Sequence, residues 1–382
     1  MEIKSIGEVS QVNLSQIRGT HKGPISYVDT SSVVYGKFNS PIIYSSVQDA
    51  PSRARRLAKS GDTVISTVRP KMCHYGYISS VNEKDIFSTG FVVVHPQRQV
   101  IEPYYLYLVL TSDKVTEKLQ QIAETSTTTY PSIKPSDITS IDIIIPSRKY
   151  QQDVAGIIGA IDEKILLNQQ INKNLLRLCR IQFNRVKLAC SSTTDLSNIA
   201  VLMMGQSPKG NTYNQKGEGT PLLNGAADFR GGINPSKYTS DPKKVTKPGD
   251  YVFGVRATIG LTTKVFGRYA IGRGTGLARS LKPESDELLY FILEDSFDYF
   301  SHAATGSVYP NVSRKDFETY SSPAFSDNSQ RVFHSFAAPL MEKIYQNETQ
   351  NKKLTQIRDI LLPKLLSGSV DLSGIEEAMK NA

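Results

Sequence analysis

Hydrophobic and polar positions follow two different rhythms in this chain, and each rhythm occurs twice. Over residues 1–147 and 195–326, short β-branched or aromatic runs such as Thr63–Ser66, Phe91–Val94 and Tyr251–Phe253 alternate with stretches rich in Gly, Pro, Ser and Thr. Such runs between turn residues are typical of strands. Over about 150–186 and 328–366, apolar residues recur at steps of three and four with almost no internal glycine. That pattern predicts two long amphipathic helices.

Each helical stretch has one continuous apolar seam that contains two asparagines. The first seam is Val154, Ile158, Ile161, Ile165, Asn168, Asn172, Leu175 and Cys179; the second is Phe333, Ala337, Leu340, Ile344, Asn347, Asn351, Leu354 and Leu361. Polar groups inside a coiled-coil seam lower stability but specify register and partner. We therefore expect the two helices to pair with each other; the alternative is two unrelated surface helices. Gly159 and Pro339 predict a short segment before a long one in each helix.

The chain repeats itself at a constant spacing. Tyr130 to Leu175 realigns with Tyr309 to Leu354 at an offset of 179 residues without a gap. Gly61-Asp62 with its following strand recurs as Gly249-Asp250, so the duplication covers nearly the whole chain. Two similar units in one polypeptide imply an approximate twofold axis.

The sequence therefore predicts an α+β protein with two globular α/β domains joined by two long antiparallel coiled-coil helices, as a pseudo-twofold internal repeat. The expected divisions are a first domain at 1–149, a helix and linker at 150–190, a second domain at 191–327, a second helix at 328–368, and a tail at 369–382 near the N-terminal domain. The straight part of each helix, roughly 27 residues, would be about 40 Å long. One turn of B-DNA is about 34–36 Å, so such a pair could hold two reading domains about one turn apart.

Composition narrows the class of protein. The 382 residues are 39% hydrophobic and 21% charged, with no apolar run long enough to cross a bilayer and no secretory leader pattern, so we expect a cytoplasmic protein. The three cysteines show no metal or disulfide spacing. A formal charge of +9 is compatible with a polyanionic partner. The basic excess lies mostly in the first half, where the densest cluster is Arg53, Arg55, Arg56 and Lys59.

Motifs for catalysis are largely missing. The sequence contains neither the GxxxxGK[ST] loop of nucleotide sites nor HExxH, and its five histidines have no metal spacing. Asn234-Pro235-Ser236-Lys237 is only superficially similar to the catalytic loop of adenine methyltransferases. The glycine-rich stretch 272–276 is best interpreted as a turn, in which Arg273 could approach a phosphate. We expect no catalytic residue and no metal site.

Small polar and basic residues recur between the halves instead. The loops before the two repeated Tyr-Pro pairs contain Thr127, Thr128 and Tyr130 in one half and Ser307 and Tyr309 in the other. Hydroxyls there suit hydrogen bonds to phosphates or base edges, although a polar loop that caps the next element would look the same. Arg69, Lys71 and Arg256 follow the repeated Gly-Asp strands, where a guanidinium could pair with guanine or form a salt bridge within its domain.

These motifs together resemble the specificity (S) subunit of type I restriction-modification enzymes. In that family a Gly-Asp strand ends in an Arg-x-x-x-Gly turn, which Arg256 to Gly260, including Thr258, matches. A Gly-Ser-x-x-Pro loop follows, matched at Gly306–Pro310, and then a Gln-x-x-[Ile/Val] helix start at Gln152 and Gln330. The first half departs from the pattern, because Thr67 to Met72 replaces the Arg-x-x-x-Gly turn.

The resemblance implies a non-catalytic DNA-recognition subunit whose two target-recognition domains each read one half of an asymmetric bipartite site in double-stranded DNA. It implies two modification (methyltransferase) subunits that methylate adenine N6, and restriction subunits that translocate and cleave DNA. S-adenosylmethionine, ATP and Mg²⁺ would then belong to those partners, with no cofactor in this chain. The alternatives are a coiled-coil adaptor that binds proteins, or a self-contained DNA methyltransferase or nuclease.

Overall fold

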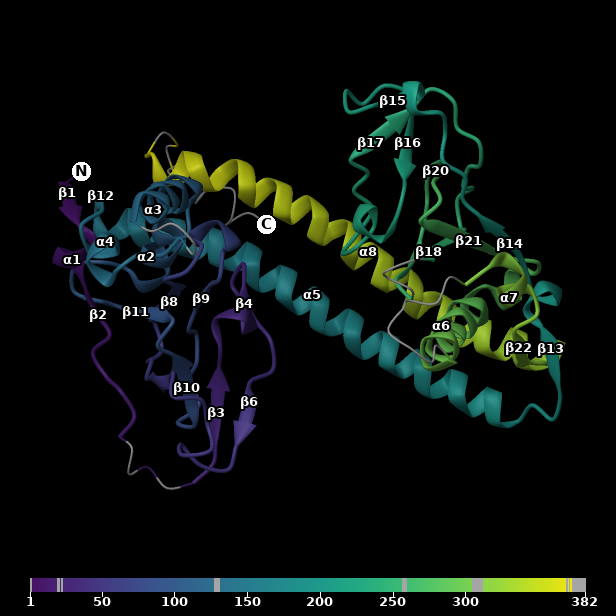
Figure 1. Ribbon diagram of the computed structural model, residues 1–382, viewed down its shortest axis with the longest axis horizontal. Helices are drawn as coiled ribbons and strands as arrows, with labels where there is room; N and C mark the ends of the chain where they lie inside the picture. Colours follow the sequence, from purple (N-terminus) through teal and green to yellow (C-terminus); the bar gives the residue numbers. More distant parts are fainter. Residues whose placement is uncertain are drawn as a thin grey trace. The chain divides into compact units, whose positions relative to one another are not determined.

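The computed structural model describes residues 2–18, 21, 23–126, 131–255, 260–303, 312–368, 370 and 372. The chain divides into two compact units: Met1–Ile165 with Lys353–Ala382, and Leu166–Lys352. The long helices α5 (Arg148–Leu188) and α8 (Asp327–Leu366) each contribute to both units. Each unit is therefore built from its own strands and short helices together with one part of α5 and one part of α8 (Figure 1).

Both long helices are continuous where the sequence suggested a break. The α5 helix runs through Gly159 and α8 runs through Pro339, whose ring lies on the exposed side of the helix. Phe333, Ala337 and Met341 are buried on either side of Pro339. Packing at these residues holds the helix together although proline lacks one backbone hydrogen bond. After α8 the chain adopts a left-handed conformation at Gly368, the conformation that commonly ends a helix.

Among its described residues, the first unit contains four sheets, one of them the two-stranded hairpin β4-β5, and four short helices. The sheet orders are β1-β12, β6-β3-β10-β7 and β2-β11-β8-β9, with the hairpin β4-β5 beside them. Its strands are β1 (Glu2–Ser5), β2 (Ser10–Val12), β3 (Ile25–Val28), β4 (Val33–Val34), β5 (Lys37–Phe38), β6 (Ile42–Tyr44), β7 (Ala54–Arg56), β8 (Thr63–Ser66), β9 (Tyr75–Tyr77), β10 (Asp85–Ser88), β11 (Phe91–Pro96) and β12 (Asp142–Ile145). Its helices are α1 (Ile6–Val9), α2 (Pro103–Leu110), α3 (Asp113–Ser126) and α4 (Pro135–Thr139).

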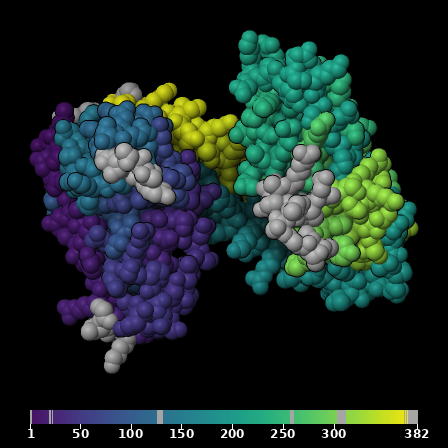
Figure 2. All heavy atoms as spheres, viewed as in Figure 1, coloured from purple at the N-terminus to yellow at the C-terminus, as the bar shows by residue number. Residues whose placement is uncertain are grey.

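The second unit repeats much of this strand order. Its sheets are β13-β22, β15-β17-β16-β20 and β14-β21-β18-β19. Its strands are β13 (Thr193–Asp195), β14 (Ala200–Met204), β15 (Tyr213–Asn214), β16 (Thr220–Leu223), β17 (Lys237–Thr239), β18 (Tyr251–Gly254), β19 (Thr262–Lys264), β20 (Ala270–Ile271), β21 (Thr275–Ser280) and β22 (Ser321–Pro323). Its helices are α6 (Asp286–Ala303) and α7 (Arg314–Glu318). In the space-filling view, the teal strands β15 to β17 form a lobe of this unit (Figure 2).

The central sheet of each unit is buried on both faces. In β18, Tyr251 and Phe253 face a core shared with α6, α5 and α8, whereas Val252 faces the second sheet. Strand β8 divides in the same way, with Ile65 toward the helices and Val64 toward the other sheet. This alternation follows from the two-residue period of a strand, and burial of both faces explains the unbroken apolar runs in the sequence.

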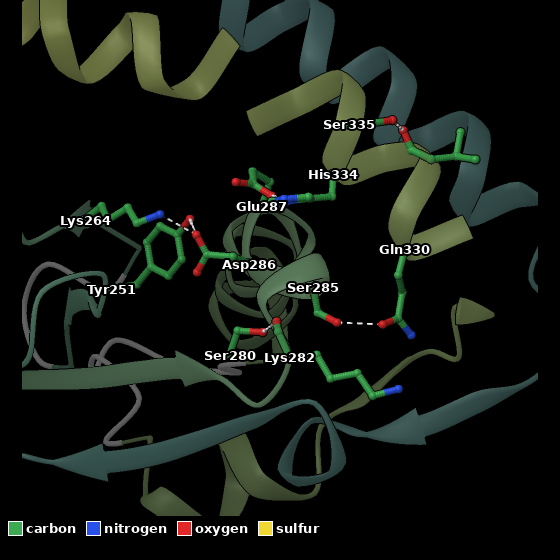
Figure 3. Close-up of polar contacts among 11 residues, drawn as sticks. Tyr251, Lys264, Ser280, Lys282, Ser285, Asp286, Glu287, Gln330, His334 and Ser335 are labelled. Carbon is green, nitrogen blue, oxygen red and sulfur yellow. Dashed lines mark hydrogen bonds and ion pairs between the residues drawn. The ribbon is translucent and has the colours of Figure 1, made fainter. Parts of the chain in front are cut away.

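A glutamine near the start of each long helix ties that helix to its own unit. Gln151 donates to the carbonyl oxygen of Pro146 (3.0 Å) and accepts from the backbone of Glu102 (2.8 Å). Gln330 donates to the carbonyl oxygen of Phe325 (2.8 Å) and accepts from the Ser285 hydroxyl (2.7 Å; Figure 3). Gln151, and not the neighbouring Gln152, therefore matches Gln330.

Candidate nucleic-acid interface

Two separated basic segments of the first unit meet at one turn, the connection between β10 and β11. The backbone N–H of Thr89 donates to the carbonyl oxygen of Arg53 (2.8 Å). The carbonyl oxygen of Gly90 accepts from both the N–H (2.8 Å) and the hydroxyl (3.0 Å) of Thr67. Arg53 and the segment that leads to Arg69 therefore lie on either side of this turn, which we call the first corner (residues 53, 67–71 and 88–90).

The segment Thr67–Cys73 is held in an unusual backbone conformation. Arg69 and Cys73 have φ values of 49° and 53° and flank a 3-10 turn at Pro70–Met72. The backbone of Arg69 donates to Pro131 (2.8 Å), and that of Lys71 donates to the Gln120 side chain (3.1 Å). Sparsely populated conformations persist only where the surroundings impose them, and they are common at functional sites. The turn thus presents Arg69 and Lys71, both exposed, from a fixed backbone.

The cluster Arg53, Arg55, Arg56 and Lys59 does not form one exposed patch. Arg53 and Lys59 are exposed, but Arg55 and Arg56 are half-buried on β7, and burial lowers the pKa of the Arg56 guanidinium. Lys59 lies in the turn before β8, where its N–H donates to Asp62 (2.7 Å), and Arg69 follows the other end of that strand. Within this cluster, only Arg53 lies at the first corner.

The second unit has an equivalent turn, Gly272–Gly274, which leads into β21. The N–H of Val255 donates to the carbonyl oxygen of Gly274 (3.1 Å), as Thr67 does to Gly90. Asn224 lies against both glycines, so closely that a methyl group added at either one would overlap it. Arg273 between them is exposed. We call this region, residues 255 and 272–274, the second corner; Arg273 occupies there the position of Thr89.

The other expected contact residues lie outside the described part of the chain. These are Thr127, Thr128, Tyr130, Arg256, Thr258, Ser307 and Tyr309. Their flanking residues are described on one side or the other: Ile133 donates its N–H to Thr67 (2.8 Å), so the chain that follows the first of these loops pairs with the first corner. Val255, immediately before Arg256, belongs to the second corner.

The seam asparagines of the long helices contact one another within the second unit. Asn168 donates to Asn351 (2.9 Å) and to Gln350 (2.8 Å), and Asn347 donates to Asn172 (2.8 Å). The remaining seam residues are all buried or half-buried: Ile161, Ile165, Leu175, Leu340, Ile344 and Leu354. The contacts run in opposite chain directions, so α5 and α8 are antiparallel in this unit.

A buried aspartate lies at the end of β8 and of β18 that is distant from each corner; the sequence analysis did not predict the burial of these two carboxylates or their partners. Asp62 contacts the Nδ1 atom of His95, and Asp250 receives a bidentate contact from Arg279 (2.6 and 2.7 Å). Both carboxylates also accept an N–H from a lysine three residues earlier. Burial raises the pKa of the Asp62 carboxyl above its ordinary value, against the opposing effects of Lys59 and His95. The repeated Gly-Asp pair was the available sequence signal.

A second polar cluster joins α6 to its surroundings in the second unit. Lys264 forms an ion pair with Asp286, which also accepts from the Tyr251 hydroxyl (3.3 Å). His334 on α8 contacts Glu287 (2.6 Å; Figure 3). These contacts fix α6 against β18, β19 and α8. Because each partner is occupied by another protein group, the cluster is best explained as support for the fold.

Metal-ligand clusters and membrane-spanning helices are both absent from the residues that the structure describes. There, no three or more His, Cys, Asp or Glu side chains are grouped so that they could hold a metal ion. Within the same residues, no helix is both long and apolar enough to span a membrane.

Comparison with known proteins points in one direction. Residues 1–177 match the family described as type I restriction modification DNA specificity domain. The specificity subunit of the type I restriction enzyme HindI from Haemophilus influenzae is 22% identical, over 96% of this chain and 98% of that protein. The putative MjaX specificity subunit from Methanocaldococcus jannaschii is 25% identical, over 81% of this chain and 78% of that protein.

A solved structure has the same fold. The crystal structure of the S subunit of a type I restriction-modification system from M. genitalium covers 95% of both chains with a TM-score of 0.60, at 14% sequence identity. At that identity the likeness concerns the fold. It agrees with the α+β architecture of two units expected from the sequence.

Proposed function

We propose that this chain, whose residues 1–177 match the type I restriction modification DNA specificity domain, is a specificity subunit that recognises a DNA sequence on behalf of partner subunits that modify or cleave the DNA. One structural observation carries the proposal beyond the family assignment. Each unit has a corner at the same end of the same four-stranded sheet, and each corner presents an exposed arginine on a constrained turn, Arg69 in one and Arg273 in the other. Arginine is the side chain best suited to bidentate contact with guanine or phosphate.

The two units would then be target-recognition domains that each read one block of an asymmetric, bipartite site. Their different corners support this division, because a turn containing Arg69 and Lys71 offers a different surface from the Gly272–Gly274 turn. The helices α5 and α8, of 41 and 40 residues, would act as a coiled-coil spacer that relates the two domains by a pseudo-twofold axis. Their length would set the unread gap between the two blocks.

The partner subunits would carry out the catalytic reactions. Two methyltransferase subunits would use S-adenosylmethionine to methylate adenine N6, and restriction subunits would use ATP and Mg²⁺. This chain would be non-catalytic, would hold no cofactor, and would act in the cytoplasm, where these partners meet DNA. A coiled-coil adaptor or a self-contained methyltransferase is less well supported, because the family match concerns DNA specificity.

The experiment is co-expression with the modification subunit encoded beside this chain, followed by single-molecule sequencing of host DNA for N6-methyladenine. We expect a split motif of two short blocks at a fixed gap, absent when the chain is deleted. Methylation that is unchanged by the deletion would overturn the proposal.

Two matched substitutions assign the blocks to the units. Arg69→Gln and Arg273→Gln should each relax or weaken one block only, and the two blocks should differ. Removing one cation that binds a phosphate should also make the salt dependence of DNA affinity shallower, by about 0.9 in the log–log slope. Arg314→Gln, at an exposed site on α7, is the control and should change neither block.

A further inference from the structure

The repeat raises a problem of pairing. The long helices α5 and α8 match each other at an offset of 179 residues, so α5 could in principle pair with α5 of a second copy as it pairs with α8. The asparagines do not prevent this. Asn168 faces Asn351 and Asn172 faces Asn347 within the chain, and a pair of α5 helices in the same register would place Asn168 opposite Asn172. Amide would still meet amide.

We infer that the ion pair between Asp162 and Arg358 makes α5 select α8 and reject a second α5. In the first unit Arg358 donates to Asp162 (2.9 Å), and the Tyr104 hydroxyl on α2 donates to the other carboxylate oxygen (2.7 Å). The two charged side chains are only 24% and 32% exposed. Arg358 also contacts Asp359, its neighbour on α8 (2.9 Å). The carboxylate of Asp162 is thus enclosed by partners from α2 and α8.

The equivalent positions in the second unit carry no charge. At the offset of 179, Asp162 corresponds to Met341 and Arg358 corresponds to Cys179. Both residues lie in the apolar core of the second unit with at most 3% of their surface exposed. Burial raises the pKa of the Cys179 thiol to about 11, so this thiol is neutral at physiological pH. At these equivalent positions of α5 and α8, the first unit therefore has an ion pair and the second unit has buried apolar residues.

If α5 paired with a second α5, or α8 with a second α8, neither Asp162 nor Arg358 would face its opposite charge. Two α5 helices would place each Asp162 opposite a Cys179, and two α8 helices would place each Arg358 opposite a Met341. The α5 pair leaves two half-buried carboxylates without an opposite charge, which is strongly unfavourable. The α8 pair leaves each half-buried Arg358 with only the exposed Asp359 of its own helix as a partner. A polar group at one position of a helix pair is a known way to select the partner. Only the unlike pair satisfies Asp162, Arg358 and the Tyr104 hydroxyl at once.

Charge reversal in separate full-length chains tests this selection. A chain with Asp162→Arg opposes two arginines when α5 folds onto its own α8, and a chain with Arg358→Asp opposes two aspartates. If the two variants are co-expressed with different tags, reciprocal exchange of α5 and α8 creates two correct ion pairs. We expect a mixed dimer of twice the 42.3 kDa chain mass, at least tenfold enriched over dimers of either variant alone. Light scattering and two-tag purification measure it.

Two further chains complete the design. The double variant Asp162→Arg with Arg358→Asp in one chain restores opposite charges and should be monomeric. It should recover most of the unfolding temperature that the single variants lose, but not all of it, because an arginine at position 162 cannot accept the Tyr104 hydroxyl and an aspartate at position 358 lies beside Asp359. Reversal of Lys149 and Asp153, an ion pair within α5 alone, divided between two chains in the same way, should give no mixed dimer.

Three outcomes would overturn the inference. Single variants that stay monomeric with wild-type stability would show that the ion pair does not influence pairing. Single variants that lose stability, regain it in the double variant and yet form no mixed dimer would show a stabilising contact without partner selection. A double variant that is not restored would show that Asp162 and Arg358 do not act through their charges.

Discussion

The two units both bury an aspartate before their central strand, but they pair its carboxylate with different basic side chains. Each begins its central strand, β8 or β18, with a left-handed glycine and a buried aspartate, and each places a basic side chain of the neighbouring strand opposite that aspartate. In the second unit the partner is Arg279, which contacts both oxygens of Asp250. In the first unit it is His95, which contacts one oxygen of Asp62.

The comparison shows that the contact between the aspartate and the preceding backbone is common to both units, whereas the basic partner of the aspartate differs. The aspartate accepts the N–H of Lys59 or Lys247 and so closes the turn before the strand, a task that both units need. The partner only neutralises the carboxylate. A guanidinium does this permanently and with two parallel hydrogen bonds, whereas an imidazole does so through one contact and only when it is protonated. The second unit should therefore depend more strongly on its pair.

The largest effect is expected from Arg279→Ala. It leaves the carboxylate of Asp250, which is 1% exposed, without its opposite charge. Loss of one partner of a buried pair typically costs about 3–5 kcal/mol, and because Arg279 is partly exposed we expect a loss of about 3 kcal/mol. Hydrogen exchange of the β18 and β21 amides measures the opening free energy, with β8 and β11 as the internal reference.

Two controls sharpen the Arg279 experiment. Arg279→Lys keeps the charge without the planar fork and should recover only part of the loss. Lys282→Ala removes an exposed cation just after the same strand and should leave exchange unchanged. Equal losses in β8 and β18 after Arg279→Ala would refute the assignment of the effect to one unit.

The next largest loss of stability is expected from a glycine substitution at the second corner, and the matching substitution at the first corner should cost less. A methyl group in Gly274→Ala overlaps the carbonyl oxygen of Asn224, which is backbone and cannot rotate away. In Gly90→Ala the methyl group lies 2.9 Å from Cγ2 of Thr30, a side chain that can move. We expect a loss of about 2–3 kcal/mol for Gly274→Ala and about 1 kcal/mol or less for Gly90→Ala. Thermal unfolding of the two single variants compares them; a Gly90→Ala loss as large as that of Gly274→Ala would contradict the expected difference.

The elements that the sequence predicted best are the two long helices, because their apolar seams repeat over many residues. The seam residues recur over about seven helical turns in each helix. The helices α5 and α8 begin within two residues of the expected positions. The break expected at Pro339 was wrong, because buried neighbours on both sides hold the helix. Period and propensity are local properties, whereas the packing that overrides them is not.

The site could be predicted only in part, for the same reason. Arg69 and Arg273 stood out beside repeated strand and turn signals, but His95 and Arg279 did not, because only strand pairing places them opposite Asp62 and Asp250. The basic cluster at 53–59 looked continuous in sequence, yet strand β7 leaves Arg55 and Arg56 half-buried. The pairing of Asp162 with Arg358 joins residues far apart in the chain and needed the register of two helices.

A smaller effect is expected when the histidine of the first unit is removed. His95→Ala deletes one of the contacts of Asp62 but leaves the N–H of Lys59 in place. An unsatisfied buried acceptor costs about 1–3 kcal/mol, and we expect about 1–2 kcal/mol here, less than for Arg279→Ala. His95→Gln can still donate a hydrogen bond and should recover part of it. Exchange of the β8 and β11 amides reports the loss; a His95→Ala effect larger than that of Arg279→Ala would reverse the ranking of the two pairs.

The smallest effect concerns pH and the carboxyl of Asp62. Because burial raises its pKa, the folded state binds this proton more tightly than the unfolded state does. Stability from this group is therefore highest below the ordinary aspartate value, and it declines as pH rises from that value through the raised folded value. Asp62→Asn cannot titrate but still offers an oxygen to the N–H of Lys59, so its stability should lack this decline. Exchange of the β8 amides in the wild type and in Asp62→Asn, followed from about pH 3.5 upward, compares the two slopes. Parallel slopes would mean that the Asp62 carboxyl titrates alike in the folded and unfolded states, which would contradict the raised pKa that burial gives this group.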